Sequence, residues 1–300
     1  MFTQLYQVNT FGYFMNFKKI TIIGKYNNLK EDPSFLEKLK SLIKFIDGQG
    51  LQVFIEEKTE QQFKINQYQS ITLAECNNVD LIIVLGGDGT MLGVARAVSH
   101  LNVPIVGINQ GRFGFLADVS FGDMENELSQ ILQGTYELDK RMLLQVKVTR
   151  DDNLIYESIA FNDVVIKSGS RLIELELSVD QKLLHKQRSD GIIIATPTGT
   201  TAYALSAGGP ILHPTIDAVS IVPISPHTLS NRPIALDATK PISAKIIDMD
   251  EGFLSVDGQI KFPLDMRDKI SIDKSKNTIT ILHPKDYCYF EMLRNKLNWG

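Results

Sequence analysis

Apolar and polar residues follow two different patterns along this chain of 300 residues. Over roughly the first 138 residues, short apolar runs typical of buried strands alternate with stretches in which apolar residues recur every three to four positions, as in helices. Strands that alternate with helices predict a layered α/β domain with a mostly parallel sheet. We expect strands over 18–24, 51–57, 80–87 and 103–109, and helices over 32–48, from just after Gly89, and over 123–134.

After about residue 138 the helical period almost disappears, and short strands separated by turns predict an antiparallel β-sandwich-like domain. We expect these strands over 141–150, 154–166, 172–180, 191–197, 220–225, 240–248, 252–258 and 269–275. A short helix within 198–210 interrupts them, and helical spacing returns over 286–300, which we expect to pack back on the first domain. The predicted organisation is an N-terminal domain over 15–138, a β domain over 139–283 and a returning segment over 284–300, preceded by a loose extension over 1–14.

Composition and charge exclude several classes of protein. A net charge of −4 argues against a nucleic-acid partner, which normally requires a basic face. No apolar run reaches the roughly 18 residues needed to span a membrane, and the N-terminus lacks the features of a secretory signal. The two cysteines, Cys76 and Cys288, fit no metal or redox spacing and favour a reducing, cytoplasmic compartment. The five histidines are scattered, so we expect no metal site built by the protein alone.

The stretch "LIIVLGGDGTML", residues 81–92, joins a predicted strand to a predicted helix. It fits a tight turn with Asp88 as helix cap about as well as it fits a phosphate loop formed by Gly86, Gly87, Gly89 and Thr90. In a phosphate loop at the carboxyl end of a parallel strand, Asp88 would hold Mg²⁺ or accept a proton from an attacking hydroxyl. The signatures of P-loop NTPases and of dinucleotide-binding dehydrogenases are both absent.

Three further segments are candidates for ligand binding. Hydroxyl-bearing residues crowd "TPTGTTAYALS" over 196–206, where Tyr203 has the chemistry to stack on a base, and we favour a ligand there over an ordinary sandwich corner. Asn162 and Asp163 are able to chelate a ribose diol, although the dipeptide alone favours an Asx turn or β-bulge. Asp257 and Gly258 predict a plain hairpin turn.

These segments occur in an order and at distances that resemble the bacterial NAD kinases, which phosphorylate the 2′-hydroxyl of the adenosine ribose of NAD to make NADP. The GGDGT loop alone is weak, since diacylglycerol kinases, sphingosine kinases and 6-phosphofructokinases carry similar loops. The segment "DGIIIATPTGTTAYALSAGGPI", with "PHTLSNRPI" and "VDGQ" after it, is specific to this resemblance. It departs from the common pattern at Asp163, where many members have Glu, and at Ala195, where serine is common.

The resemblance implies roles for individual residues. Asp88 matches the general base, and the matched positions that bind NAD are Asp88, Gly89, Asn162, Asp163, Arg171, Arg188, Asp190, Thr201, Ala202, Tyr203, Ser206 and Gln259. It also implies ATP with Mg²⁺ or another divalent cation, NAD held in an interdomain cleft, and a homo-oligomer, either a dimer or a tetramer.

Two other functions stay open at this point. One is a GGDGT-type kinase whose acceptor is a lipid or a sugar, and the other is a non-catalytic sensor of NAD or NADP. A pure sensor has no need for a carboxylate beside the phosphates, so Asp88 argues against it.

Overall fold

The computed structural model describes residues 17–24, 33–111, 114–228 and 230–299. They form two compact units. The first contains the described residues of 1–91, 103–139 and 281–300, and the second contains 92–102 and 140–280. The predicted extension over 1–14 and the predicted helix start at Asp32 lie outside the described residues.

The first unit is built on the predicted parallel sheet. Its strands lie in the order β3-β2-β1-β4-β5, and each of these strands runs parallel to its neighbours. Two further segments pair with β5: β6, and the end of β18 through Ile281 opposite Ile105. The strands are β1 (Lys19–Gly24), β2 (Gln52–Glu56), β3 (Gln69–Ile71), β4 (Leu81–Leu85), β5 (Ile105–Asn109), β6 (Val119–Ser120) and β18 (Asp268–His283).

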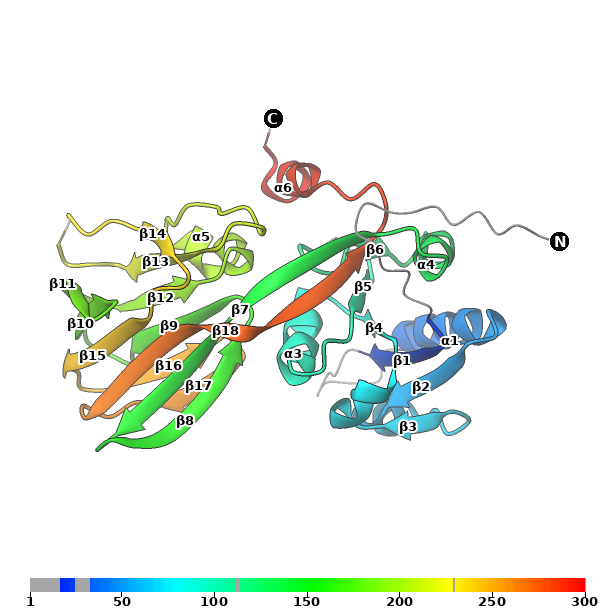
Figure 1. Ribbon diagram of the computed structural model, residues 1–300, viewed down its shortest axis with the longest axis horizontal. Coiled ribbons are helices and arrows are strands. Elements are labelled where there is room, and N and C mark those ends of the chain that lie inside the picture. The colour runs from blue at the N-terminus through cyan, green and yellow to red at the C-terminus, as the bar shows by residue number, and fades with distance from the viewer. Residues whose placement is uncertain (1–16, 25–32, 112–113, 229, 300) are drawn as a thin grey trace. The chain divides into compact units, whose positions relative to one another are not determined.

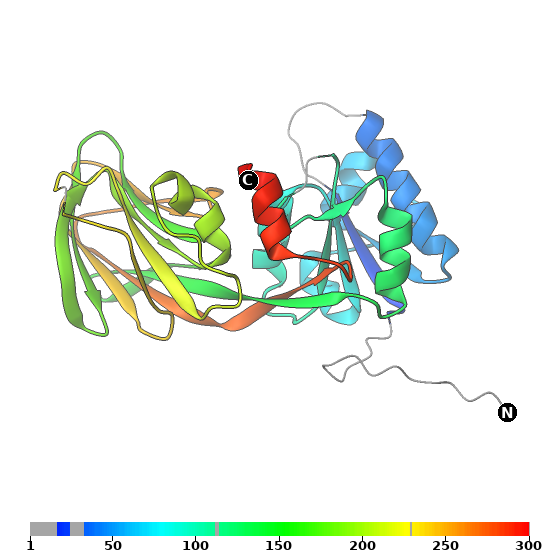
Figure 2. The ribbon, with the colours of Figure 1, turned by 90° about the horizontal axis from the view of Figure 1, so that it is seen from above.

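Helices α1 and α4 cover one face of this sheet, as both ribbon views show (Figure 1, Figure 2). Apolar residues of α1 such as Leu39 and of α4 such as Leu128 share one buried cluster with Ile22 and Ile83 of the strands, so the amphipathic pattern of the helices is explained by this burial. The first unit contains α1 (Pro33–Gly48), α2 (Glu57–Phe63), the 3₁₀ helix η1 (Leu73–Asn78), α4 (Met124–Leu132), α6 (Tyr289–Leu297) and the start of α3 (Asp88–Val98).

The second unit is the predicted antiparallel β sandwich (Figure 1). One sheet has the order β11-β10-β15-β18, with β7 next to β18 and β8 next to β7, and the other has the order β14-β13-β12-β9-β16-β17. A core that includes Val146, Ile192 and Ile270 fills the space between them. The remaining strands are β7 (Glu137–Arg150), β8 (Asn153–Ala160), β9 (Asp163–Ser168), β10 (Ile173–Val179), β11 (Lys182–Ser189), β12 (Gly191–Ala195), β13 (Ala218–Ile224), β14 (Ile234–Asp237), β15 (Ile242–Asp248), β16 (Gly252–Val256) and β17 (Ile260–Pro263).

Two predicted strands differ from the observed ones. The strand predicted over 154–166 is two strands, because the chain leaves one sheet after Ala160 and enters the other at Asp163. The strand predicted over 269–275 continues to His283, since its last residues pair with β5. The helix expected just after Gly89 begins at Asp88.

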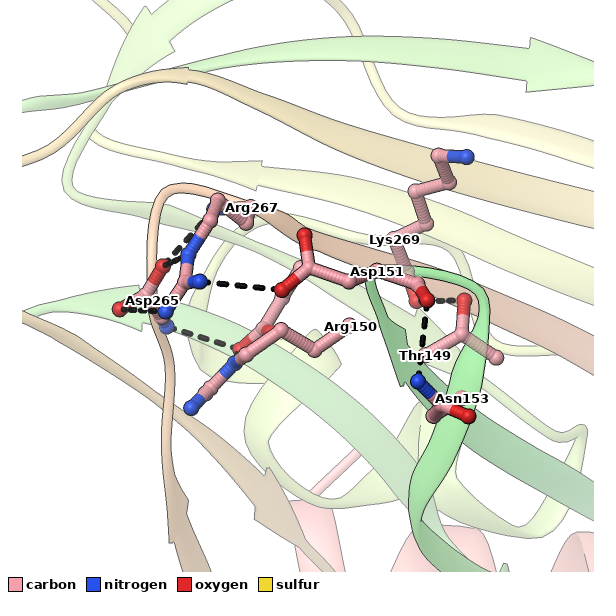
Figure 3. A network of polar contacts seen from close by, with 8 residues as sticks. Thr149, Arg150, Asp151, Asn153, Asp265, Arg267 and Lys269 are labelled. Atoms are coloured by element: carbon pink, nitrogen blue, oxygen red, sulfur yellow. Dashed lines mark hydrogen bonds and ion pairs between the residues drawn. The ribbon is translucent and has the colours of Figure 1, made fainter.

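One end of the sandwich is held by a network of charged residues, drawn in Figure 3. Arg150 at the end of β7 donates two hydrogen bonds, of 2.7 and 3.0 Å, to the buried carboxylate of Asp268. Arg267 contacts both Asp265 and Asp151, the latter in the β7–β8 turn. The network therefore fixes the β7–β8 hairpin to the start of β18.

Within the part of the chain that the structure describes, the helices are all too short or too polar to cross a lipid bilayer. Cys76 is buried, Cys288 is exposed, and both are free thiols.

Candidate functional site

The GGDGT turn connects β4 to α3 at the carboxyl end of the parallel sheet. A side chain at Gly86 would come within 2.8 Å of Thr90 Cβ, so the packing of the turn itself requires glycine there. A side chain at Gly87 would meet no atom of the described residues within 4 Å. The backbone at Gly87 is therefore open to an approaching group, which a phosphate loop needs.

Asp88 does not cap its own helix with its carboxylate. Its Oδ2 accepts a hydrogen bond of 2.8 Å from the amide of Phe115, and its Oδ1 accepts bonds of 3.0 and 3.2 Å from the amides of Leu116 and Ala117. An ionised carboxylate has about four acceptor positions, and these amides of the described residues use three of them, one on Oδ2 and two on Oδ1. Three backbone amides thus hold the Asp88 carboxylate in place.

In the second unit another carboxylate fixes the turn that carries Asn162 and Asp163. Oδ1 of Asp257 accepts hydrogen bonds from the amides of residues 161, 162 and 163, at 3.0, 2.7 and 3.1 Å. Its Oδ2 lies 2.6 Å from the guanidinium of Arg96. The predicted hairpin is present, with positive φ at Asp257 and Gly258, but the aspartate side chain also organises the neighbouring turn.

Four of the predicted NAD-binding residues, Asn162, Asp163, Ala202 and Tyr203, line one pocket of about 310 Å³ within the second unit. Tyr203 is more than a third exposed, so its ring is accessible for stacking, and Lys167 Nζ lies 5.7 Å from the centre of this ring. The remaining lining residues are Val165, Lys167, Phe253, Ser255, Asp257, Gly258 and Lys261.

Asp163 has an unusual electrostatic environment. Its burial, followed by the negative charge of Asp257, raises the pKa of the Asp163 carboxyl to about 7. Near neutral pH this group therefore exists in both protonation states, and it is able to donate as well as accept a hydrogen bond. Both actions suit the recognition of a ribose hydroxyl.

The threonines of "TPTGT" hold this segment in place. The Thr196 hydroxyl donates to the carbonyl of Phe161 at 2.6 Å, and the Thr200 hydroxyl donates to the carbonyl of Pro197 at 2.6 Å. Thr198 accepts a hydrogen bond from the buried Arg141. These hydroxyl groups therefore have a structural role, because they form hydrogen bonds with polar groups of a buried, irregular segment.

The other predicted NAD-binding residues lie outside the lining of this pocket. Gln259 accepts a hydrogen bond from Arg96, and Thr201 donates one to the carbonyl of Thr198. Arg171 is largely exposed and pairs with Asp250 at 3.3 Å. Arg188 and Ser206 are exposed and Asp190 is half-buried. Gly89 is exposed and lies in the first turn of α3, in the first unit.

Sequence reasoning missed Lys167, Lys261 and Arg96. A signal for Lys167 was present, since residues 163, 165 and 167 of β9 all line the pocket, as alternate residues of a strand share one face. Arg96 carried no comparable signal, because its partner Asp257 lies 161 residues away.

The described residues contain no cluster of three or more His, Cys, Asp or Glu side chains suited to a metal ion. Mg²⁺ is commonly held by one or two carboxylates together with substrate phosphates.

A GGDGT turn at the carboxyl end of a parallel sheet, and a pocket in a β sandwich lined by four predicted NAD-binding residues, are features that fit a nucleotide-dependent phosphotransferase. The family model of the ATP-NAD kinase N-terminal domain matches residues 7–136, and that of the ATP-NAD kinase C-terminal domain matches residues 161–283. The chain belongs to the ATP-NAD kinase family, and NAD kinase is the activity that its relatives support.

Similar proteins span nearly the whole chain. An NAD kinase of Thiobacillus denitrificans is 43% identical over 287 residues, covering 95% of this chain and 98% of the relative. An NAD kinase of Nitrosomonas europaea is 44% identical, covering 95% and 96%. Among solved structures, an NAD kinase from Archaeoglobus fulgidus in complex with ATP has a TM-score of 0.72 at 26% identity, covering 94% of this chain and 100% of its own. The chain also shares its fold with yeast NADH kinase, solved in complex with NADH. The TM-score is 0.83 at 24% identity, and the match covers 95% of this chain and 89% of the yeast chain.

Proposed function

We propose that this chain transfers the γ-phosphoryl group of ATP to the 2′-hydroxyl of the adenosine ribose of NAD, with Asp88 as the general base. The observation that carries the residue assignments is the gathering of Asn162, Asp163, Ala202 and Tyr203 around one pocket.

In this mechanism the 2′-hydroxyl donates a hydrogen bond to the acceptor position left on Asp88 Oδ2. As the new O–P bond forms, the proton passes to this carboxylate and the bond from the γ-phosphorus to the β,γ-bridging oxygen breaks, releasing ADP. General-base assistance of this kind is worth about 10²–10⁴-fold in rate. The open backbone at Gly87 lets the amides of the turn approach the phosphates.

Mg²⁺ or another divalent cation would enter with ATP. Its chemistry is to neutralise charge on the phosphates, and its ligands would be mainly phosphate oxygens.

We also infer a homo-oligomer, either a dimer or a tetramer, acting in the cytoplasm. Arg171 and Arg188 are exposed and lie outside the pocket of their own chain, so a role at the site is best explained if they act across an interface with a second copy. Light scattering on the purified protein tests this inference, and a monomer at micromolar concentration would contradict it.

The reaction is tested by incubating the purified protein with NAD, ATP and a divalent cation, and following NADP with an NADP-specific dehydrogenase. We expect NADP to form in equal amounts with ADP. ADP formation only with a lipid or sugar acceptor would instead indicate another kinase of the GGDGT group. NAD binding without any ADP would indicate a sensor.

A further inference from the structure

The segment from Gly114 to Ala117 forms a cradle for the Asp88 carboxylate. The amide of Gly114 donates to the carbonyl of Ala117 at 3.0 Å, which closes the segment into a tight turn. The three amides between these ends, those of residues 115, 116 and 117, all donate to Asp88. Consecutive amides that converge on one anion in this way form a nest.

The cradle is attached to the sheet through the end of β5. The buried side chain of Asn109 donates to the carbonyls of Ala117 and Val119, at 3.3 and 3.1 Å, and accepts from the amide of Gly111 at 3.0 Å. Gly107 permits this packing, because a side chain there would come within 2.8 Å of Ala117 Cα. The cradle therefore rests on a rigid strand.

The position of the Asp88 carboxyl group leaves no room for a side chain at residue 114. A Cβ atom there would overlap the Asp88 carboxyl group: its three nearest neighbours are all atoms of that group, with Cγ at 2.6 Å. Gly114 is buried and is not among the glycines with positive φ, so its backbone conformation is open to alanine. What excludes a methyl group at this position is the carboxylate.

We propose that Gly114 is a positioning residue for the phosphoryl transfer. The missing side chain lets the Asp88 carboxylate lie directly against the amides of the cradle. This inference rests on the proposed role of Asp88 as base. A carboxylate displaced by a methyl group would lose its alignment, and a misplacement of about 1 Å is able to cost about 100-fold in rate.

The first test is Gly114→Ala, compared with Gly48→Ala in α1, where a side chain would meet nothing within 4 Å. We expect kcat to fall by about 100-fold in Gly114→Ala. The dissociation constant for NAD, measured by calorimetry, should change less than about threefold, because the NAD pocket lies in the second unit. Gly48→Ala should match the unmodified protein. A normal kcat in folded Gly114→Ala would overturn the proposal.

A double-variant cycle with Asp88→Ala separates positioning from a general loss of folding. Alone, Gly114→Ala should lower the unfolding temperature. In the Asp88→Ala background it should leave that temperature unchanged, because the new methyl group occupies space that the carboxylate has left. An equal loss of stability in both backgrounds would overturn the proposal. A chain that makes no NADP, or an Asp88→Ala variant with full kcat, would refute the proposed function, while the unfolding temperatures would still report whether methyl and carboxylate compete.

Discussion

The carboxylate of Asp257 lies 2.6 Å from the guanidinium of Arg96, and both side chains are largely or fully buried. The same carboxylate holds the amides of residues 161–163, so this ion pair supports the turn that carries Asn162 and Asp163. Arg96 also donates to Gln259, at 2.5 Å. Two of the predicted NAD-binding segments are therefore joined through one arginine that sequence patterns did not single out.

Replacing Arg96 by Met is expected to destabilise the second unit, because it leaves the Asp257 carboxylate buried without its cation. Removing one partner of a buried ion pair costs about 3 kcal/mol or more. Urea unfolding measures this loss, and the dissociation constant for NAD should rise in parallel as the turn loosens. Arg96→Lys keeps the positive charge, so its free energy of unfolding should lie between those of Arg96→Met and the unmodified protein.

The matched control for Arg96→Met is Lys240→Met. Lys240 pairs with Asp180 at 3.7 Å, and both side chains are about half exposed. An exposed pair of this kind contributes less than about 1 kcal/mol. Similar losses in the two variants would show that the Arg96–Asp257 pair has no special role.

The carboxyl group of Asp163 should make stability depend on pH. Its pKa is raised to about 7 in the folded chain from an ordinary value of 3.8, so folding favours the protonated form. The stability linked to this proton is fully present below about pH 4 and is lost as the pH rises through 7. Asp163→Asn has no carboxyl group at this position, so it does not lose this stability as the pH rises. The free energy of unfolding of Asp163→Asn minus that of the unmodified protein should therefore increase between pH 4 and pH 8, by a few kcal/mol at most.

Guanidinium unfolding of both proteins at several pH values measures this difference. Glu127→Gln should produce a similar trend in the first unit, where burial and then the charges of Asp118 and Asp123 raise the pKa of Glu127 to about 7. Parallel pH profiles for Asp163→Asn and the unmodified protein would contradict the assignment of a raised pKa to Asp163.

Gly199→Ala should separate the "TPTGT" segment from the Asn162 turn. A side chain at Gly199 would overlap the backbone of Asn162, with Cα at 2.8 Å. Overpacking at such a site costs about 1–3 kcal/mol. We expect a lower unfolding temperature together with weaker NAD binding, measured by calorimetry. Stability and NAD affinity like those of Gly48→Ala would be inconsistent with this packing.

The fold class could be predicted because the central strands have strong patterns. Both β4 and β5 are buried along their whole length, and α1 has its apolar residues on one face. Four of the strands that were not predicted, β3, β11, β14 and β17, lie at the edges of their sheets, and the other, β6, is a two-residue strand that pairs with β5. An edge strand is buried against one neighbour only, so polar residues such as those of "KLLHKQRS" are tolerated and the alternation fades.

The site was predicted where its residues are close in sequence, and not where folding brings distant residues together. GGDGT was singled out as a short motif between a strand and a helix, whereas Asn162 and Asp163 were proposed as NAD-binding residues only through the resemblance, because the dipeptide alone favours a turn. The segment 114–117 was missed for two reasons. Its contacts with Asp88 come from backbone amides, which any sequence possesses. Its glycine is required because a side chain there would overlap the carboxylate of Asp88, 26 residues earlier in the chain. Side-chain chemistry alone does not reveal such a contact.

The most direct test of the account is the rate of NADP formation by Asp88→Asn, with NAD binding and unfolding temperature measured on the same preparation. Asparagine keeps the shape of the side chain but is a very poor proton acceptor. We predict that kcat falls by about 10²–10⁴-fold while the folded variant binds NAD within a few-fold of the normal affinity. A folded Asp88→Asn variant that forms NADP at the normal rate would contradict the assignment of Asp88 as the base.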